Sequence, residues 1–328
     1  SDDSTEVLSG QAYGSYFIEG QDERVAVAET SNGGTVLTSW TGGYAWTSAP
    51  SDFEDELSKY RKRLIIVKTD SSGDEQWRKI IGPEGYDINS KQIGLSSDYN
   101  WVGTGVVANT STDDIIVSGY QGSVNSPTGY DVFLMEFASD GGINWHKTFN
   151  SNSNNNDFAG SVLERSSGGY AIATYAQGYS GLILTDMDGD NPVKKYYNDN
   201  SKGWIQTPSL RKTSDNGFVL VGSTYETSGS NYDYYVVKTS ADGTKEWAMA
   251  YDNASRDDKA TSAEEDTSGN IWVFGRSTLP GHENTHIWAI KLASGDGQML
   301  DSVTIAGDSV DANAYIAKDS VALPNGNF

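Results

Sequence analysis

The sequence predicts an all-β protein, a β-propeller built from four-stranded antiparallel blades. Three observations support this fold class. A short hairpin motif recurs along the chain, alternating apolar runs flank each copy, and the 3.6-residue spacing of amphipathic helices is almost absent. A repeat of about fifty residues that holds four short strands is the length of one propeller blade.

The clearest copy of the motif is KTSADGTKEW at residues 238–247, and KTDSSGDEQW (68–77) and EFASDGGINW (136–145) repeat it. TDMDGDNPV (185–193) and KLASGDGQML (291–300) are weaker copies. The turn glycines are Gly73, Gly141, Gly189, Gly243 and Gly297, at intervals of 68, 48, 54 and 54 residues. A strand, a glycine turn and a second strand predict a hairpin, which we assign to strands C and D of each blade. We expect Trp247 to pack between neighbouring blades.

A second hairpin precedes each copy of the motif. SLRKTSDNGFVLVGST, from Ser209, is the clearest, and three stretches beginning at residues 25, 161 and 262 match it. These runs predict strands A and B, so that each unit has four antiparallel strands. The regular Asp-Gly turns of the C–D hairpins should lie together on one face, and the B–C and D–A connections on the other.

These repeats resemble a known family. YDYYVVKTSADGTKEW and TSDNGFVLVGST are similar to the short β-propeller repeats of secreted and surface-anchored prokaryotic proteins, over nearly the whole chain. The resemblance implies a propeller fold and an extracellular or cell-surface location, but no particular activity. The motif also comes close to the Asp box of sialidases and to the tryptophan-docking motif of quinone-dependent dehydrogenases. Its adjacent Asp242 and Gly243 depart from the spacing of both, so shared hairpin geometry explains the likeness.

Counting the units predicts six blades in a single domain over residues 1–328. Five complete units run from about Val25 to Ile305. The N-terminal residues align with the end of strand C and with strand D, and residues 311–328 align with strand A. Joining the two ends gives a sixth blade shared between the termini, in which strand B is missing. Either the chain is a fragment, or a segment from elsewhere, such as a neighbouring subunit, completes this last blade.

Two insertions interrupt the repeat. Residues 42–63 lengthen a B–C connection and predict a short helix after Pro50, which either packs on the propeller rim or forms a lid over a ligand. Residues 95–114 are expected to lengthen the A–B connection of the second blade and to carry Trp101 to the opposite face.

The candidate ligand site lies on the face of the B–C and D–A connections. Trp46 and Trp204 are candidate platforms for stacking a sugar ring. An aspartate also recurs just ahead of strand A, which would bring several carboxylates to the mouth of the central channel. Such a ring could bind cations or a polyhydroxylated ligand, or each carboxylate could accept backbone N–H bonds and order its turn. Periodic recurrence favours the second interpretation. These residues are Asp22, Asp87, Asp157, Asp257 and Asp311.

The best calcium candidate is DMDGDN, where Asp186, Asp188 and Asp190 alternate before a turn. Their carboxylates are hard oxygen ligands, but the twelve-residue loop and closing Glu of an EF-hand are missing. We expect no required cofactor, with calcium as the one ion to consider.

Composition excludes several classes of function. The formal charge of −22 repels phosphate backbones, which argues against nucleic-acid binding. The chain has no cysteine, and no apolar run approaches the length of a transmembrane helix. No Gly-x-Ser-x-Gly elbow supports a Ser-His-Asp triad. We therefore expect a non-catalytic extracellular or cell-surface module for adhesion, binding a glycan or a surface protein. The alternatives are a structural subunit that assembles with another chain or with copies of itself, and a carbohydrate-active enzyme.

Overall fold

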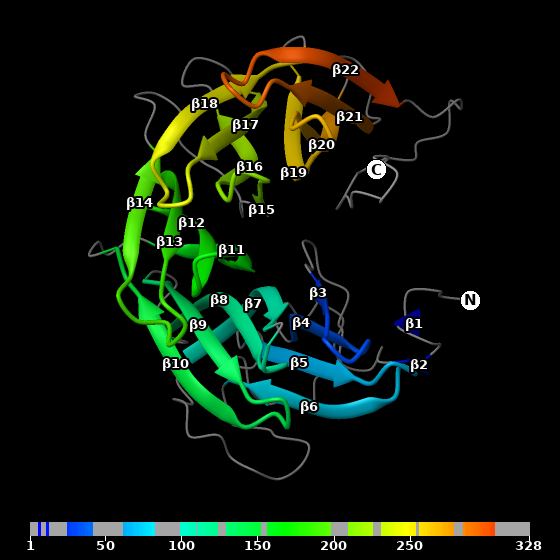
Figure 1. Ribbon diagram of the computed structural model, residues 1–328, viewed down its shortest axis with the longest axis vertical. Coiled ribbons are helices and arrows are strands. Elements are labelled where there is room, and N and C mark those ends of the chain that lie inside the picture. Colours follow the sequence, from blue (N-terminus) through cyan, green and yellow to red (C-terminus); the bar gives the residue numbers. More distant parts are fainter. Residues whose placement is uncertain are drawn as a thin grey trace, which may run out of the picture. The chain divides into compact units, whose positions relative to one another are not determined.

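The computed structural model describes residues 6–7, 11–12, 25–41, 62–82, 99–109, 111–123, 129–151, 156–197, 209–225, 231–253, 256–278 and 285–305 (Figure 1). Within these ranges the secondary structure consists of strands and turns. They contain no helix long and apolar enough to cross a membrane.

Twenty strands form five four-stranded antiparallel sheets, as the repeats predict. The first sheet is β3 (Ala26–Glu29), β4 (Thr35–Thr41), β5 (Arg63–Thr69) and β6 (Glu75–Ile81). The second is β7 (Tyr99–Ala108), β8 (Ile115–Ser123), β9 (Asp131–Phe137) and β10 (Ile143–Phe149). The third is β11 (Phe158–Glu164), β12 (Tyr170–Ala176), β13 (Tyr179–Leu184) and β14 (Val193–Tyr197). The fourth is β15 (Ser209–Lys212), β16 (Phe218–Tyr225), β17 (Tyr232–Thr239) and β18 (Lys245–Tyr251). The fifth is β19 (Asp257–Glu265), β20 (Ile271–Thr278), β21 (Thr285–Leu292) and β22 (Met299–Ile305).

Strand order within every sheet follows the chain, so each sheet is an antiparallel meander. The expected sixth blade falls mainly on residues 1–24 and 306–328. Of these, the structure describes only the short pair β1 (Glu6–Val7) and β2 (Gln11–Ala12). Five sheets are therefore seen, and a sixth stays a prediction.

The chain has two compact units, Ser1–Glu164 and Arg165–Phe328. In the first unit, β7 packs against β3, β4 and β5. Gly103 of β7 permits this close approach, because a Cβ there would lie 2.4 Å from the hydroxyl of Thr38 and 2.5 Å from a methyl of Leu64. The core of this unit is an aliphatic and aromatic cluster drawn from both sheets, including Leu64, Phe133 and Phe137.

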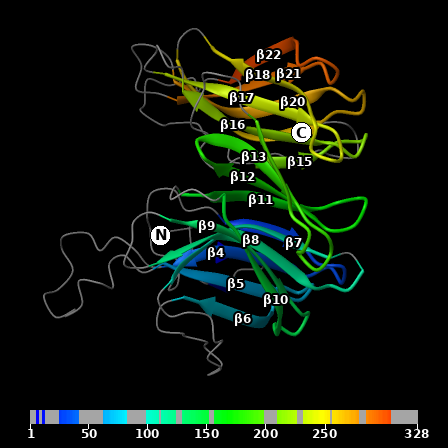
Figure 2. The same ribbon diagram turned by 90° about the vertical axis from the view of Figure 1, so that its left-hand side faces the viewer.

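In the second unit, β19 packs against β15, β16 and β17. β19 is labelled in Figure 1, and its three partners are labelled in both Figure 1 and Figure 2. The core again lies between two sheets. It contains Val236, Val273 and Ile290, which are fully buried, together with Trp247 and Trp288. Each unit is thus stabilised by apolar side chains between consecutive sheets rather than within one sheet.

The expected A–B insertion at residues 95–114 is wrong over its described part. Tyr99–Ala108 form β7, the first strand of the second sheet, in register with β8. Trp101 is 2% exposed and packs edge-on against Phe133, with ring centroids 5.1 Å apart. It is a core residue and not a surface ring, because the true A–B turn spans only residues 109–114.

A common turn closes most A–B and C–D hairpins. In the fourth sheet the Ser240 N–H donates to the Thr244 carbonyl (2.9 Å), and the Gly243 N–H donates to the Ser240 carbonyl (3.0 Å). Gly243 has φ +77, the left-handed conformation that glycine adopts without steric cost, and the ladder has a bulge next to it. Two A–B turns instead place Asp113 (φ 60) and Asn216 (φ 65) at this position.

The prediction that Trp247 packs between sheets is confirmed. Its ring is 8% exposed and its Nε1–H donates to the carbonyl of Ser294, in the C–D turn of the next sheet (2.8 Å). A Cβ on Gly297 of that turn would lie 2.8 Å from the ring, so glycine is required there on two grounds. In the first unit Trp77 makes the same bond to Ser139 (2.8 Å).

A tyrosine at the end of strand D makes a second contact between sheets. The hydroxyl of Tyr197 donates to the carbonyl of Gly243 (2.9 Å), and that of Tyr251 donates to the carbonyl of Gly297 (2.5 Å). In both pairs the acceptor is the turn glycine of the following sheet. The second unit is therefore held by aromatic rings whose polar atoms are satisfied by the next turn.

Substitution of Trp247 by alanine should cost about 3–5 kcal/mol of unfolding free energy, because it removes a buried ring and leaves a cavity. Val193 occupies the same position of the third sheet and is 48% exposed. Val193→Ala is therefore the matched control and should cost less than about 0.5 kcal/mol. Urea unfolding followed by circular dichroism measures both. Equal losses for the two variants would contradict the assignment of Trp247 to the inter-sheet core.

Candidate functional site

Most of the predicted ligand residues lie outside the described residues. These are Trp46, Trp204, Asp22, Asp87 and Asp311. The predicted helix within residues 42–63 also lies outside them, apart from Lys62 and Arg63 at the start of β5.

Asp157 is hydrogen-bonded within the loop that precedes β11. The residue is 2% exposed. One carboxylate oxygen accepts the N–H of Ser151 (2.7 Å), and the other accepts its hydroxyl (2.8 Å). The interpretation that such an aspartate orders the connection ahead of the first strand therefore holds here. Asp257 also accepts a backbone bond, from the N–H of Tyr232 (3.1 Å).

Asp258, and not Asp257, is the counterpart of Asp157 in the fifth sheet. Asp258 is fully buried and accepts the N–H of Asn253 (2.7 Å), whereas Asp257 is exposed. Burial raises the pKa of Asp258 to about 7. The Ser277 hydroxyl and the Asn253 N–H oppose this rise, and the negative charge of Asp252 adds to it.

The DMDGDN carboxylates form an ordinary C–D turn. Asp186 accepts the N–H groups of Asp188 (3.1 Å) and Asp190 (2.7 Å) through one oxygen, and the side-chain amide of Asn191 (2.7 Å) through the other. In the part of the chain that the structure describes, no three His, Asp or Glu side chains gather as metal ligands. Calcium binding by these residues stays a prediction.

The recurrent lysine of strand C is buried and pairs with two carboxylates that are exposed to solvent. Lys238 is fully buried, with its Nζ 2.7 Å from Asp215 and 3.1 Å from Glu246. Burial raises the pKa of Asp215, but hydrogen bonds from Lys238, Thr213 and the Gly217 N–H outweigh it and lower that pKa to about 2. These pairs tie strand C to its neighbouring strand and turn, so we assign them to the scaffold.

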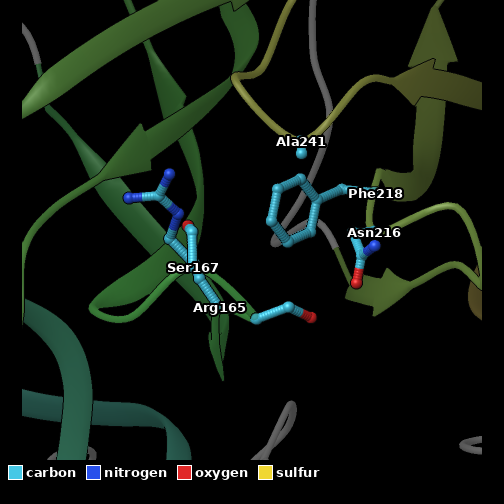
Figure 3. A pocket seen from close by; sticks show the side chains of 6 residues that line it. Arg165, Ser167, Asn216, Phe218 and Ala241 are labelled. Carbon is cyan, nitrogen blue, oxygen red and sulfur yellow. The ribbon is translucent and has the colours of Figure 1, made fainter.

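Two adjoining concavities lie on the second unit, at the ends of its A–B and C–D hairpins (Figure 3). Their volumes are about 310 and 530 Å³, and they share Arg165 and Ser167. We call them together the turn groove. In Figure 3 Arg165 and Phe218 lie on opposite sides of the smaller concavity, with Asn216 beside the phenyl ring.

Charged groups of both signs line the larger concavity. Arg165 and Lys195 contribute the cations, and Asp186 and Asp242 the carboxylates. Hydrogen bonds from Ser240 and Thr244 lower the pKa of Asp242 to about 2, and Lys195 contributes to this shift. Asp242 is therefore ionised at neutral pH and can accept hydrogen bonds from a ligand.

No protein-family model matches the chain, and no curated protein matches it in sequence. Solved structures are similar at the level of the fold. The NanB sialidase from Streptococcus pneumoniae, in complex with 2-[(3-chlorobenzyl)ammonio]ethanesulfonate, is 11% identical with a TM-score of 0.56, over 96% of this chain and 67% of that one. A mutant of that sialidase gives a TM-score of 0.58, at 11% identity over 93% and 64%. The periplasmic gluconolactonase PpgL from Pseudomonas aeruginosa is 13% identical with a TM-score of 0.51, over 92% and 77%.

These neighbours are propeller-type proteins, and the likeness supports a propeller-like fold of repeated sheets. At 11–13% identity it shows the fold alone. The chain spans about two thirds of the length of the sialidase chains.

The turn groove was not predicted from the sequence. One signal was present: Arg165 opens an A–B turn whose equivalents in other sheets begin with small polar residues, Thr30, Asn109, Thr213 and Asp266. The neighbours of Arg165 in the groove come from the C–D hairpin of its own sheet (184–195) and from both hairpins of the fourth sheet (216–218 and 241–242), which no local pattern connects to it.

Asp258→Asn should flatten the dependence of stability on pH. The folded-state pKa of Asp258, about 7, lies above the usual value of 3.8. Between pH 3.8 and about pH 7, Asp258 is therefore protonated in the folded chain and ionised in the unfolded chain. Stability that is present below about pH 4 is therefore lost as the pH rises to about 7. One pKa unit corresponds to ~1.4 kcal/mol, so the wild type should lose a few kcal/mol more than the variant between pH 4.5 and 8.

Urea unfolding at a series of pH values measures this difference, with Asp257→Asn as the control at the exposed neighbouring carboxylate. The control should keep the wild-type slope. Parallel curves for the wild type and Asp258→Asn would refute the assignment.

Proposed function

We propose that the protein is a non-catalytic binding module that works outside the cell or at its surface. Its ligand would be a glycan or a surface protein, held by the B–C and D–A connections. The resemblance of its repeats to those of secreted and surface-anchored proteins supports the location. The observation that supports the binding role is the contrast between the two ends of the strands.

At one end, the A–B and C–D connections are short and nearly uniform, such as residues 30–34, 70–74 and 240–244. At the other end the B–C and D–A connections are unequal, from residues 177–178 between β12 and β13 to several long ones. Residues 42–62 join β4 to β5, residues 82–98 join β6 to β7, and residues 198–208 join β14 to β15. Loops that vary on a uniform scaffold are where binding residues concentrate. Two of these three long connections contain Trp46 and Trp204, the proposed sugar platforms.

Two buried polar groups of the scaffold are engaged within the fold. Lys238 is paired with two carboxylates, and Asp157 is bonded to Ser151. We therefore assign neither Lys238 nor Asp157 a role in proton transfer to a substrate.

The double substitution Trp46→Ala and Trp204→Ala should reduce glycan binding at least tenfold, because stacking on an aromatic face contributes about 0.5–1.5 kcal/mol per ring and two rings are removed. A glycan array identifies the ligand with the wild-type chain, and isothermal titration calorimetry measures the affinity. Trp272→Ala is the control, since Trp272 lies in β20 and stacks on Phe274.

Unchanged binding by the double variant would show that the platform is elsewhere. The same wild-type preparation should leave fluorogenic glycosides and sialosides intact. Their hydrolysis would favour the alternative of a carbohydrate-active enzyme.

We further propose that a sixth blade shared between the termini covers β22. The residue eight positions after each turn glycine is Ile81, Phe149, Tyr197, Tyr251 or Ile305. The first four are 3%, 5%, 5% and 7% exposed, whereas Ile305 is 55% exposed. An apolar residue at a position that is buried in four sheets supports a covering element over the fifth. The covering element would come from the terminal segments or, in the assembly alternative, from another chain.

Ile305→Ala should therefore cost about 2–4 kcal/mol of unfolding free energy, as a buried isoleucine does. Val303→Ala is the control. Val303 is 43% exposed. The residue at the same position of the fourth sheet, Met249, is also exposed (40%), although that sheet has the fifth sheet next to it. A cost that does not vary with protein concentration supports closure by the chain itself, and a concentration-dependent cost supports assembly. A cost below about 0.5 kcal/mol would mean that nothing covers Ile305.

A further inference from the structure

The turn groove contains Arg165, whose side chain makes no hydrogen bond within its own A–B turn. In the other four A–B turns the side chain at this position bonds within the turn. Asn109 accepts the N–H of Ser111 (2.8 Å) and Asp266 accepts the N–H of Ser268 (2.9 Å), while the hydroxyls of Thr30 and Thr213 donate to the side chains of Asn32 and Asp215. Arg165 has no acceptor atom and cannot accept an N–H in this way. A residue that breaks the local pattern of a turn in this way is often found at a functional site.

The guanidinium of Arg165 makes one hydrogen bond to the described part of the protein. Nη1 donates to the carbonyl of Thr185 (3.0 Å), and the buried Nε has no hydrogen-bond partner. Among the described residues, no carboxylate lies within ion-pair distance of it. A partly buried guanidinium without an anion is unfavourable, since a buried charge needs a counter-charge.

The acidic residues of the groove are engaged elsewhere. Asp186 accepts three hydrogen bonds within its own turn. Asp242 accepts bonds from Ser240 (2.6 Å) and from the N–H and hydroxyl of Thr244 (3.1 and 3.0 Å). An anion supplied from outside is therefore the counter-charge that remains for Arg165.

The rest of the lining is suited to hydroxyl groups. Ser167 and Asn216 border the smaller concavity, and Asn191 and Asp242 border the larger one. These side chains offer donors and acceptors on both sides of the guanidinium. The volumes of about 310 and 530 Å³ fall in the range of small-molecule sites. One carboxylate together with several hydroxyls is the chemistry of a uronic acid.

We propose that the turn groove binds a uronic acid residue, with the sugar carboxylate on Arg165 and the sugar hydroxyls on the surrounding serine, asparagine and aspartate side chains. This site lies at the ends of the A–B and C–D hairpins. It is separate from Trp46 and Trp204, which belong to connections at the other ends of the strands. Each site can therefore fail its test while the other stands.

Titration calorimetry with digalacturonic acid tests the proposal on the full chain. The wild type should bind it and should not bind the uncharged digalactose. Arg165→Ala should weaken binding at least tenfold, and Arg165→Lys should weaken it less, because lysine keeps the charge but loses the planar fork. Arg211→Ala is the matched control and should bind like the wild type, since Arg211 is paired with Glu264 (3.0 Å).

Circular dichroism melting of each variant checks that a loss of binding is not a loss of fold. If Arg165→Ala is unfolded, Arg165→Gln takes its place. Several results would overturn the proposal: no heat from the wild type at millimolar digalacturonate, equal binding of digalactose, or full binding by both Arg165→Ala and Arg165→Gln. Binding of a dipeptide carboxylate in preference to the uronate would overturn the sugar class.

Discussion

An aromatic ring packed against the turn glycine of the next sheet is the contact on which each unit depends. Trp247 contacts Gly297 in the second unit, and Trp77 contacts Gly141 in the first. The glycine must lack a Cβ to admit the ring and must have a positive φ to close its hairpin. Turn geometry and sheet packing therefore depend on the same residue. A change in either hairpin is transmitted directly to the seam between sheets.

That dependence explains why the polar residues of the turn edge are largely structural. Asp113 accepts the N–H and hydroxyl of Ser31 in the preceding A–B turn and pairs with Lys68 (3.0 Å). Glu265 accepts the same two groups of Ser214. Carboxylates bridge successive turns in both units, and the apolar seams lie beneath them. Residues in the connections at the opposite ends of the strands are less constrained by packing between sheets. The same holds for Arg165, which differs from the small polar residues at the equivalent turn positions.

Much of the fold could be predicted from the sequence because its determinants are local and repeated. A glycine, a tryptophan four residues later and two alternating runs define a hairpin without any distant contact. The strand at residues 99–108 is not predicted in this way, because glycines at 103 and 105 are typical of a loop. They are required by close packing against neighbouring strands, which the sequence does not show. Asp257 was chosen over Asp258 since two adjacent carboxylates differ only in burial. The turn groove could not be predicted at all, because four separate hairpins build it.

The third sheet departs from the repeat in a way that affects how the second unit responds to mechanical force. Val193 stands where the fourth sheet has Trp247, and it is 48% exposed. Between the third and fourth sheets, Tyr197 donates to the Gly243 carbonyl, and the side chains of Lys195, Leu182 and Leu184 lie around that glycine. The fourth and fifth sheets share both a buried tryptophan and a tyrosine bond. The seam between the third and fourth sheets therefore lacks one buried aromatic ring that the next seam has, and we expect it to separate first when a load is applied along the chain.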